Sequence, residues 1–127
     1  ANANLLKAQA SYDCTGELDL SAIIINTSVR IEDMRFDDGS VLEFDGSAWG
    51  IGLGATGKSI GAGTFNVPPS QLLREDKILI QVFFLTVGIG GVEITFWNEY
   101  EYLGIFACGS IGAGAGSFGG DGKFSQG

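Results

Sequence analysis

The chain has 127 residues, 21 glycines, no histidine and a formal net charge of −8, a length that suits one domain built around one hydrophobic core. Seven lysines and arginines against 15 acidic residues cannot readily form the basic surface that nucleic acid requires, so we expect no nucleic-acid partner. The absence of histidine removes the most common general base and a frequent metal ligand. We therefore expect no catalytic residue, no metal site and no cofactor.

Alternation of apolar and polar residues with period two predicts strands along most of the chain. Residues 1–10 are small and polar and are expected to be a flexible N-terminal segment, whereas residues 11–125 are expected to fold as a single β-barrel domain. The expected strands are residues 11–20, 23–36, 41–55, 60–65, 77–85, 92–97, 100–107 and 109–124. The only plausible helix is short, near residues 69–76, where a proline at the start is tolerated because the first helical amide has no partner.

The second of these strands places Val29 and Ile31 on one face and Met34 and Phe36 on the other, and residues 37–40, with the sequence Asp-Asp-Gly-Ser, predict a turn after it.

Residues 77–85 are apolar on both faces, which indicates a central strand or one covered by a further layer. Turns are predicted after it at residues 88–91 and again at residues 98–99.

Glycines alternate with larger residues in two stretches. In residues 46–55 they alternate with Trp49, Ile51 and Leu53, and residues 111–117 show the same alternation of glycine with other residues. Glycine on one face of a strand allows the strand to coil or to approach another backbone, as at a barrel corner. No strand–helix–strand rhythm is present, so the predicted fold is all-β: a closed eight-stranded antiparallel β-barrel with one short α-helix near residues 69–76, with a β-sandwich as the alternative.

Residues 52–59, from Gly52 to Ser59, match the phosphate-loop pattern GxxxxGKS. That pattern binds phosphate through a helix that begins directly after it. Residues 60–65 are broken by glycine and resemble a strand, so we expect no nucleotide binding and a hairpin turn at residues 56–58 instead.

Cys14 and Cys108 lie near opposite ends of the chain. They predict either a disulfide that closes a loop of about 94 residues or two buried thiols.

Trp97, Tyr100 and Tyr102 surround one predicted turn and form a candidate interaction surface for a sugar or a partner. The alternative is a series of aromatic side chains that alternate between the core and the barrel surface.

Several short glycine and aromatic motifs together resemble the VapA-like virulence-associated proteins of Rhodococcus. The matching motifs are Ala48-Trp49-Gly50-Ile51-Gly52-Leu53-Gly54, Gly61-Ala62-Gly63-Thr64-Phe65, Leu72-Leu73-Arg74, Val82-Phe83-Phe84 and Leu103-Gly104-Ile105-Phe106. The resemblance implies a compact eight-stranded barrel and a secreted or cell-surface virulence factor without enzymatic activity. It also implies action on host endolysosomal membranes, and it offers no active-site residue to carry over.

On this basis the expected function is host–pathogen interaction by a monomeric barrel that binds host membrane lipid or a host protein. Two other functions remain open from the sequence. The aromatic-rich strands would suit a calycin-like barrel that holds a small apolar ligand, and the net charge of −8 would suit an interaction or immunity domain of a bacterial toxin system whose partner is basic.

Overall fold

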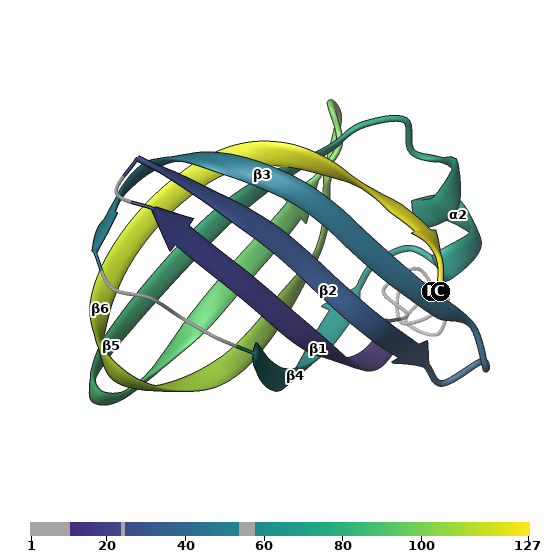
Figure 1. The fold of residues 1–127 in the computed structure, drawn as a ribbon. Coiled ribbons are helices and arrows are strands. Elements are labelled where there is room, and N and C mark those ends of the chain that lie inside the picture. Colours follow the sequence, from purple (N-terminus) through teal and green to yellow (C-terminus); the bar gives the residue numbers. More distant parts are fainter. Residues whose placement is uncertain (1–10, 24, 54–57) are drawn as a thin grey trace, which may run out of the picture.

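The computed structural model describes residues 11–23, 25–53 and 58–127, which form a closed antiparallel β-barrel with one short helix at one end (Figure 1). The elements in chain order are β1 (Tyr12–Ile23), β2 (Asn26–Phe36), β3 (Val41–Leu53), β4 (Lys58–Phe65), α2 (Pro69–Arg74), β5 (Ile78–Trp97) and β6 (Tyr102–Gln126). The all-β class, the antiparallel closure and the single short helix in the described part of the chain agree with the sequence-based prediction.

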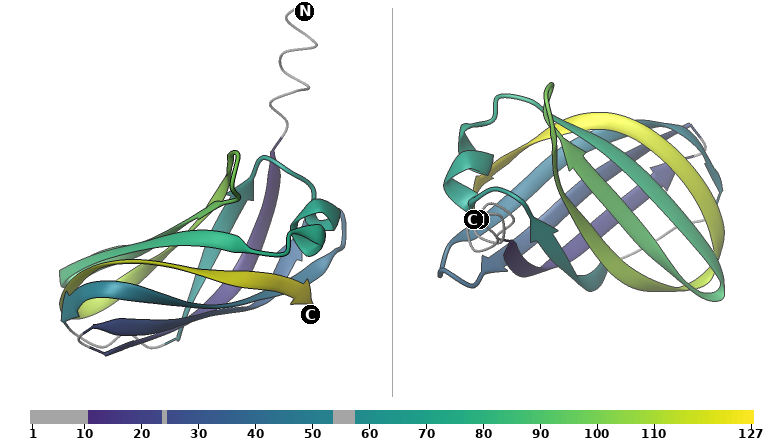
Figure 2. Two further views of the ribbon diagram at one scale, coloured as in Figure 1. Left: turned by 90° about the horizontal axis from the view of Figure 1, so that it is seen from above. Right: turned by 180° about the vertical axis from the view of Figure 1, so that it is seen from behind.

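The strands follow the order β3-β2-β1-β4-β6-β5, and the barrel closes because β3 also pairs with β6. The last strand is therefore shared among three partners. Its first part pairs with β4 over Gly104–Cys108, its last part pairs with β3 over Ala115–Gln126, and β5 follows it on its other edge. Figure 2 shows the resulting closed wall from above and from behind.

The predicted number of eight strands was wrong, because the described residues form six strands, and two of these are long and bent. β5 has 20 residues and β6 has 25, and they remain paired through the predicted turn at residues 88–91. Gly88 and Gly112 are opposite each other in this pairing and have φ angles of 78° and 115°, which glycine adopts easily and other residues rarely do. Both strands thus fold over together at one end of the barrel, which we call the bend end.

The face assignment in the second predicted strand was also wrong, because β2 contains a β-bulge. Asp33 has a φ of 55°, and the pairing of β2 with β3 shifts register between Ile31 and Met34. The extra residue of the bulge shifts the alternation by one position, so that Met34 and Phe36 point inwards as Val29 and Ile31 do. All four side chains are buried. The predicted turn at residues 37–40 is present after β2.

Phenylalanine rings fill the core, since eight of the nine phenylalanines are buried and only Phe83 is not. Four of them, Phe44, Phe65, Phe96 and Phe124, pack together with ring centroids 4.9 to 5.8 Å apart. The rings lie against glycines: the ring of Phe118, for example, occupies the space that a Cβ would need at Gly52 on the neighbouring β3 and at Gly116 on its own strand. Glycines on the inner face therefore make room for large rings.

Candidate interaction surface

The predicted aromatic surface lies at the turn between β5 and β6, at the opposite end of the barrel from the bend (Figure 1). Trp97 and Tyr102 are register partners, and their rings meet edge to face with centroids 5.1 Å apart. The Trp97 Nε1 donates a hydrogen bond to Thr95 Oγ1 at 3.2 Å. Partial burial, with a smaller effect from Glu93, raises the pKa of Tyr102. The structure thus brings Trp97 and Tyr102 together as a packed pair.

Tyr100 is separate from that pair, at the tip of the turn, where 90 % of its surface is exposed. Asn98 shapes this turn: its Oδ1 accepts hydrogen bonds from the backbone N–H groups of Tyr100 and Glu101, both at 2.8 Å. The Asn98 Nδ2 donates to Glu75 Oε1, directly after α2, at 3.1 Å. The turn is therefore tied to the end of the helix and presents one isolated aromatic ring to solvent.

Cys14 on β1 and Cys108 on β6 are free and buried. The sequence left open a disulfide or two buried thiols, and the structure has two buried thiols. β4 runs between them, with Gly63 opposite Cys14 and Gly61 opposite Cys108. Because neighbouring strands are about 4.8 Å apart, the two Cα atoms are roughly 9 Å apart or more, beyond the limit of about 7 Å for a disulfide. Burial raises the pKa of Cys14 to about 12 and also raises the pKa of Cys108. Burial therefore disfavours the thiolate, the nucleophilic form of cysteine, at both positions.

The match to the phosphate-loop pattern falls partly outside the described residues, which omit residues 54–57. A strand, β4, begins at Lys58, where a phosphate loop would require the start of a helix. The Lys58 Nζ lies 3.6 Å from Glu17 Oε1 on β1. The predicted hairpin turn at residues 56–58 also lies mostly outside the described residues, but β3 and β4 are not neighbours in the sheet and so do not form a hairpin.

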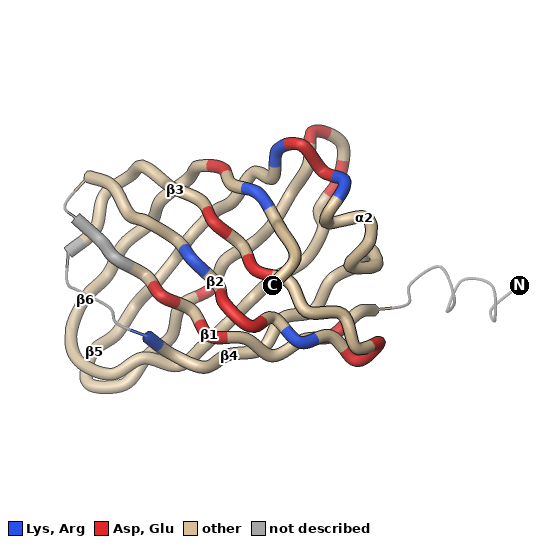
Figure 3. Tube along the Cα trace, turned by 45° about the vertical axis from the view of Figure 1, so that its right-hand side comes forward, with Lys and Arg blue, Asp and Glu red and all other residues tan. Residues whose placement is uncertain are grey.

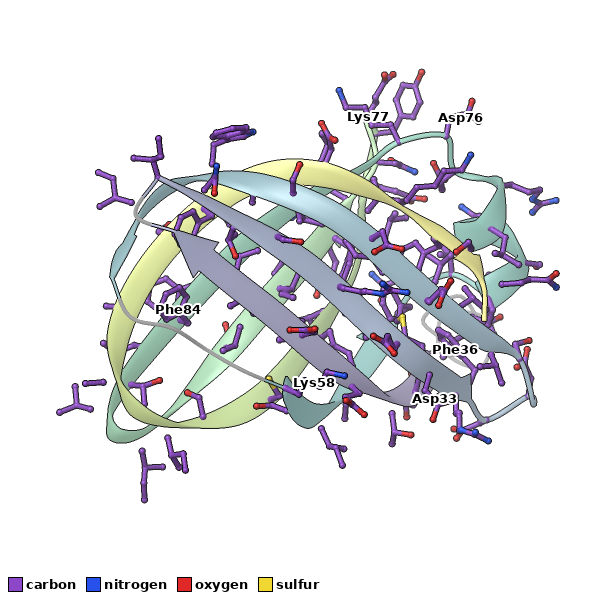
Figure 4. All side chains as sticks on the ribbon, in the orientation of Figure 1. Asp33, Phe36, Lys58, Asp76, Lys77 and Phe84 are labelled. Carbon is purple, nitrogen blue, oxygen red and sulfur yellow. The ribbon has the colours of Figure 1, made fainter. Side chains whose placement is uncertain are left out.

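A second exposed surface, which sequence reasoning did not identify, lies at the bend end. Ile51 on β3, Val87 and Ile89 on β5 and Ile111 on β6 each expose between 82 % and 86 % of their surface. The register brings them together, because Ile89 is opposite Ile111 and Ser117 on β6 separates Ile51 from Phe83. Figure 4 shows carbon-only side chains projecting from this end. We define the apolar end as the exposed side chains of Trp49, Ile51, Phe83, Leu85, Val87, Ile89 and Ile111.

The prediction that residues 77–85 are covered on both faces was wrong, since Phe83 and Leu85 are each 52 % exposed and no described element covers them. One sequence signal could have found this surface: β5 has no charged residue between Lys77 and Glu93, and β6 has none between Glu101 and Asp121. Figure 3 shows the same separation in space, with most charged residues on the half of the barrel away from the bend.

Charged residues begin where the apolar end stops, on the same outer face of β3, β6 and β5. Asp45 on β3 is opposite Lys123 on β6, and the Lys77 Nζ lies 3.7 Å from Asp121 Oδ2. These residues line an open hollow of about 580 Å³, which we call the polar hollow. Its side chains come from Asp45, Ser47, Asp76, Lys77, Asp121 and Lys123, and the backbone of two glycines completes it.

Among the described residues, no group of three His, Cys, Asp or Glu side chains is placed to hold a metal ion. No helix in this part of the chain has both the length and the apolar character needed to cross a bilayer.

A family model described as Rhodococcus equi virulence-associated protein matches residues 2–125, which is nearly the whole chain. The chain belongs to this family. The match confirms the resemblance inferred from the glycine and aromatic motifs, and it makes this Vap-family chain a virulence-associated barrel protein. No curated protein matches the chain.

Two solved structures from the intracellular pathogen Rhodococcus equi share the fold of this Vap-family chain. The virulence-associated protein VapB is 19 % identical with a TM-score of 0.63, and the match covers 92 % of this chain and 97 % of VapB. The virulence-associated protein VapD is 22 % identical with a TM-score of 0.65, and the match covers 91 % of this chain and 97 % of VapD. At these identities the comparison supports the barrel architecture.

Proposed function

We propose that this Vap-family chain is a secreted or cell-surface virulence protein that acts without catalysis, by binding a host membrane. The family supports the virulence role. One observation supports membrane binding: exposed apolar side chains gather at one end of the barrel, on strands that have no charged residue there. Soluble monomers rarely leave such a surface unpaired unless it is an interaction site.

The apolar end can supply the free energy that membrane binding requires. Complete burial of an exposed aliphatic side chain stabilises the bound state by about 1.5–3 kcal/mol. Ile51, Val87, Ile89 and Ile111 are almost fully exposed, so each can contribute about 2 kcal/mol when lipid covers it. Trp49, at the margin of this surface, is of a residue type that favours the membrane–water interface.

The two other functions have less structural support. Packed phenylalanine rings occupy the described interior, where a calycin-like barrel would hold its ligand. A role as an acidic partner of a basic toxin would rest on the net charge of −8, which is a property of the composition and not of a defined site.

Co-sedimentation with phospholipid vesicles tests the proposal. The double variant Val87→Ser/Ile89→Ser is expected to lower vesicle partitioning about 100-fold, because it removes about 3 kcal/mol of apolar transfer free energy. Tyr100→Ser is the control, since it removes a similarly exposed aromatic side chain at the opposite end of the barrel. Both variants should melt within a few degrees of the wild type, because surface changes of this kind alter stability little.

Absence of vesicle binding by the wild-type protein would refute membrane binding and direct the search to a host protein. Binding that Tyr100→Ser weakens and the double variant leaves unchanged would assign the interaction to the turn that holds Trp97, Tyr100 and Tyr102.

A further inference from the structure

The apolar end and the polar hollow are consecutive regions of one face. Successive outward residues of β3 are Ile51, Trp49, Ser47 and Asp45, spaced about 6.6 Å apart along the strand. Within roughly 20 Å the face changes from aliphatic side chains, through one tryptophan, to charged groups. The order matches the order of layers in a bilayer, from hydrocarbon through the interface to the headgroups.

The polar hollow contains groups of both signs in a chain that is otherwise strongly acidic. Lys77 is in an ion pair with Asp121, with both side chains more than half exposed. Among the described residues, Lys123 and Asp76 have no ion-pair partner and leave an ammonium group and a carboxylate available at the hollow. A ligand that carries one positive and one negative group would complement this arrangement.

We propose that the apolar end and the polar hollow form a single docking surface for a bilayer of zwitterionic phospholipid. This inference rests on the proposed membrane binding and adds an orientation and a lipid class to it. The apolar end contacts the acyl chains, and the polar hollow lies at the level of the headgroups, where its lysines face phosphate and its carboxylates face the ammonium group. An anionic headgroup without an ammonium group, such as that of phosphatidylglycerol, offers negative charge alone, which Asp45, Asp76 and Asp121 would repel.

The orientation can be tested because the chain has only two tryptophans, Trp49 at the apolar end and Trp97 at the opposite turn. Trp97→Phe leaves Trp49 as the single reporter, and Trp49→Phe leaves Trp97. On addition of phosphatidylcholine vesicles, the emission of Trp49 is expected to shift to shorter wavelength and to become protected from acrylamide. The emission of Trp97 should not change. Protection of Trp97 in place of Trp49 would overturn the orientation while membrane binding itself stands.

The lipid class can be tested with two double variants that change the net charge equally. Lys77→Glu/Lys123→Glu removes the cations of the polar hollow, and Arg35→Glu/Lys58→Glu makes the same charge change elsewhere, on β2 and β4. The first is expected to bind phosphatidylcholine vesicles about tenfold more weakly, and the second to bind like the wild type. The wild type should bind these vesicles at least as well as vesicles that also contain phosphatidylglycerol.

A requirement for phosphatidylglycerol, or equal losses in both double variants, would overturn the lipid class and leave membrane binding intact. Failure of the wild type to bind any vesicle would remove the proposed function together with this inference. Analytical ultracentrifugation without lipid adds a final outcome: a dimer that Val87→Ser/Ile89→Ser dissociates would assign the apolar end to a second copy of the chain and overturn the lipid docking surface.

Discussion

Gly120→Ala is expected to destabilise the barrel by about 2–4 kcal/mol, because it crowds the junction at which β6 closes onto β3. Gly120 is opposite Ala48, and a Cβ at position 120 would lie 2.0 Å from the carbonyl oxygen of Ser47 and 2.6 Å from the Ala48 Cα. Carbon–oxygen contacts are normally about 3.3 Å or longer, so the two strands must separate by about 1 Å. Both obstructing atoms belong to the backbone, and no side-chain rotation can relieve the contact.

Gly119→Ala is the matched control, since it makes the same substitution one residue earlier on the other face of β6. The nearest atom to a Cβ there is Gln81 Oε1 at 3.2 Å, at the end of a flexible side chain. This variant should be as stable as the wild type or more stable by about 0.5 kcal/mol, because alanine loses less conformational entropy than glycine.

Urea unfolding of the two variants measures the difference, which should appear as a shift in midpoint with an unchanged slope. In thermal unfolding the expected gap is roughly 10 °C, at about 4 °C per kcal/mol for a domain of this size. Equal stability of Gly119→Ala and Gly120→Ala would refute the reasoning and show that the closing junction relaxes freely.

Three further predictions concern the core, the thiols and the distal turn. Phe124→Ala should lower the free energy of unfolding by about 3–5 kcal/mol in urea, because its ring is fully buried in the phenylalanine cluster, and Phe124→Leu should lose less than half of that. Cys14 should resist alkylation by iodoacetamide near pH 8 until the protein is denatured. The pKa of Cys14 is raised to about 12 in the fold, so this thiol ionises first in the unfolded chain, and the free energy of unfolding should fall as the pH rises from about 9 towards 12. Cys14→Ala should remove this loss of stability. Rapid alkylation of Cys14 in the folded protein at pH 8 would contradict the prediction. Asn98→Ala should lower the free energy of unfolding by about 1–2 kcal/mol in thermal unfolding, because it removes two hydrogen bonds to the turn and one to Glu75. Glu99→Ala should change the free energy of unfolding by no more than about 0.5 kcal/mol. Equal effects of the two variants would show that these hydrogen bonds contribute little.

Local patterns in the sequence predicted the features that local chemistry decides. The turn at residues 37–40 follows from aspartate and glycine in a row, and the helix that begins at Pro69 follows from a break in the strand pattern. The number of strands was not predictable in this way. Residues 88–91 have the composition of a turn, but in the barrel they stay paired with β6. The chain therefore bends there within one strand and does not end that strand in a turn.

The apolar end escaped prediction because a period-two pattern defines two faces without saying which one is inside. Around Trp49 the ordinary expectation is reversed: Trp49 and Ile51 point to solvent, while Gly50 and Gly52 face inwards. The reason is a long-range contact with β6: the ring of Phe118 fills the interior space beside Gly52, and the backbone of Ser117 and Phe118 occupies the space beside Gly50. The pairing of Trp97 with Tyr102, by contrast, depends only on a short turn and was accessible from sequence.

The shared position of β6 has a consequence for how the chain acquires its structure. The strand that joins β3, β4 and β5 follows all three along the chain, and its pairs with β3 connect residues between 62 (Leu53 and Ala115) and 84 (Leu42 and Gln126) positions apart. Contacts this distant along the chain make folding slow, on the scale of milliseconds to seconds. During synthesis the earlier strands have no β6 to close upon, so the barrel of a nascent chain stays open until β6 has left the ribosome. Closure of the barrel therefore depends on the strand that follows all of its partners along the chain.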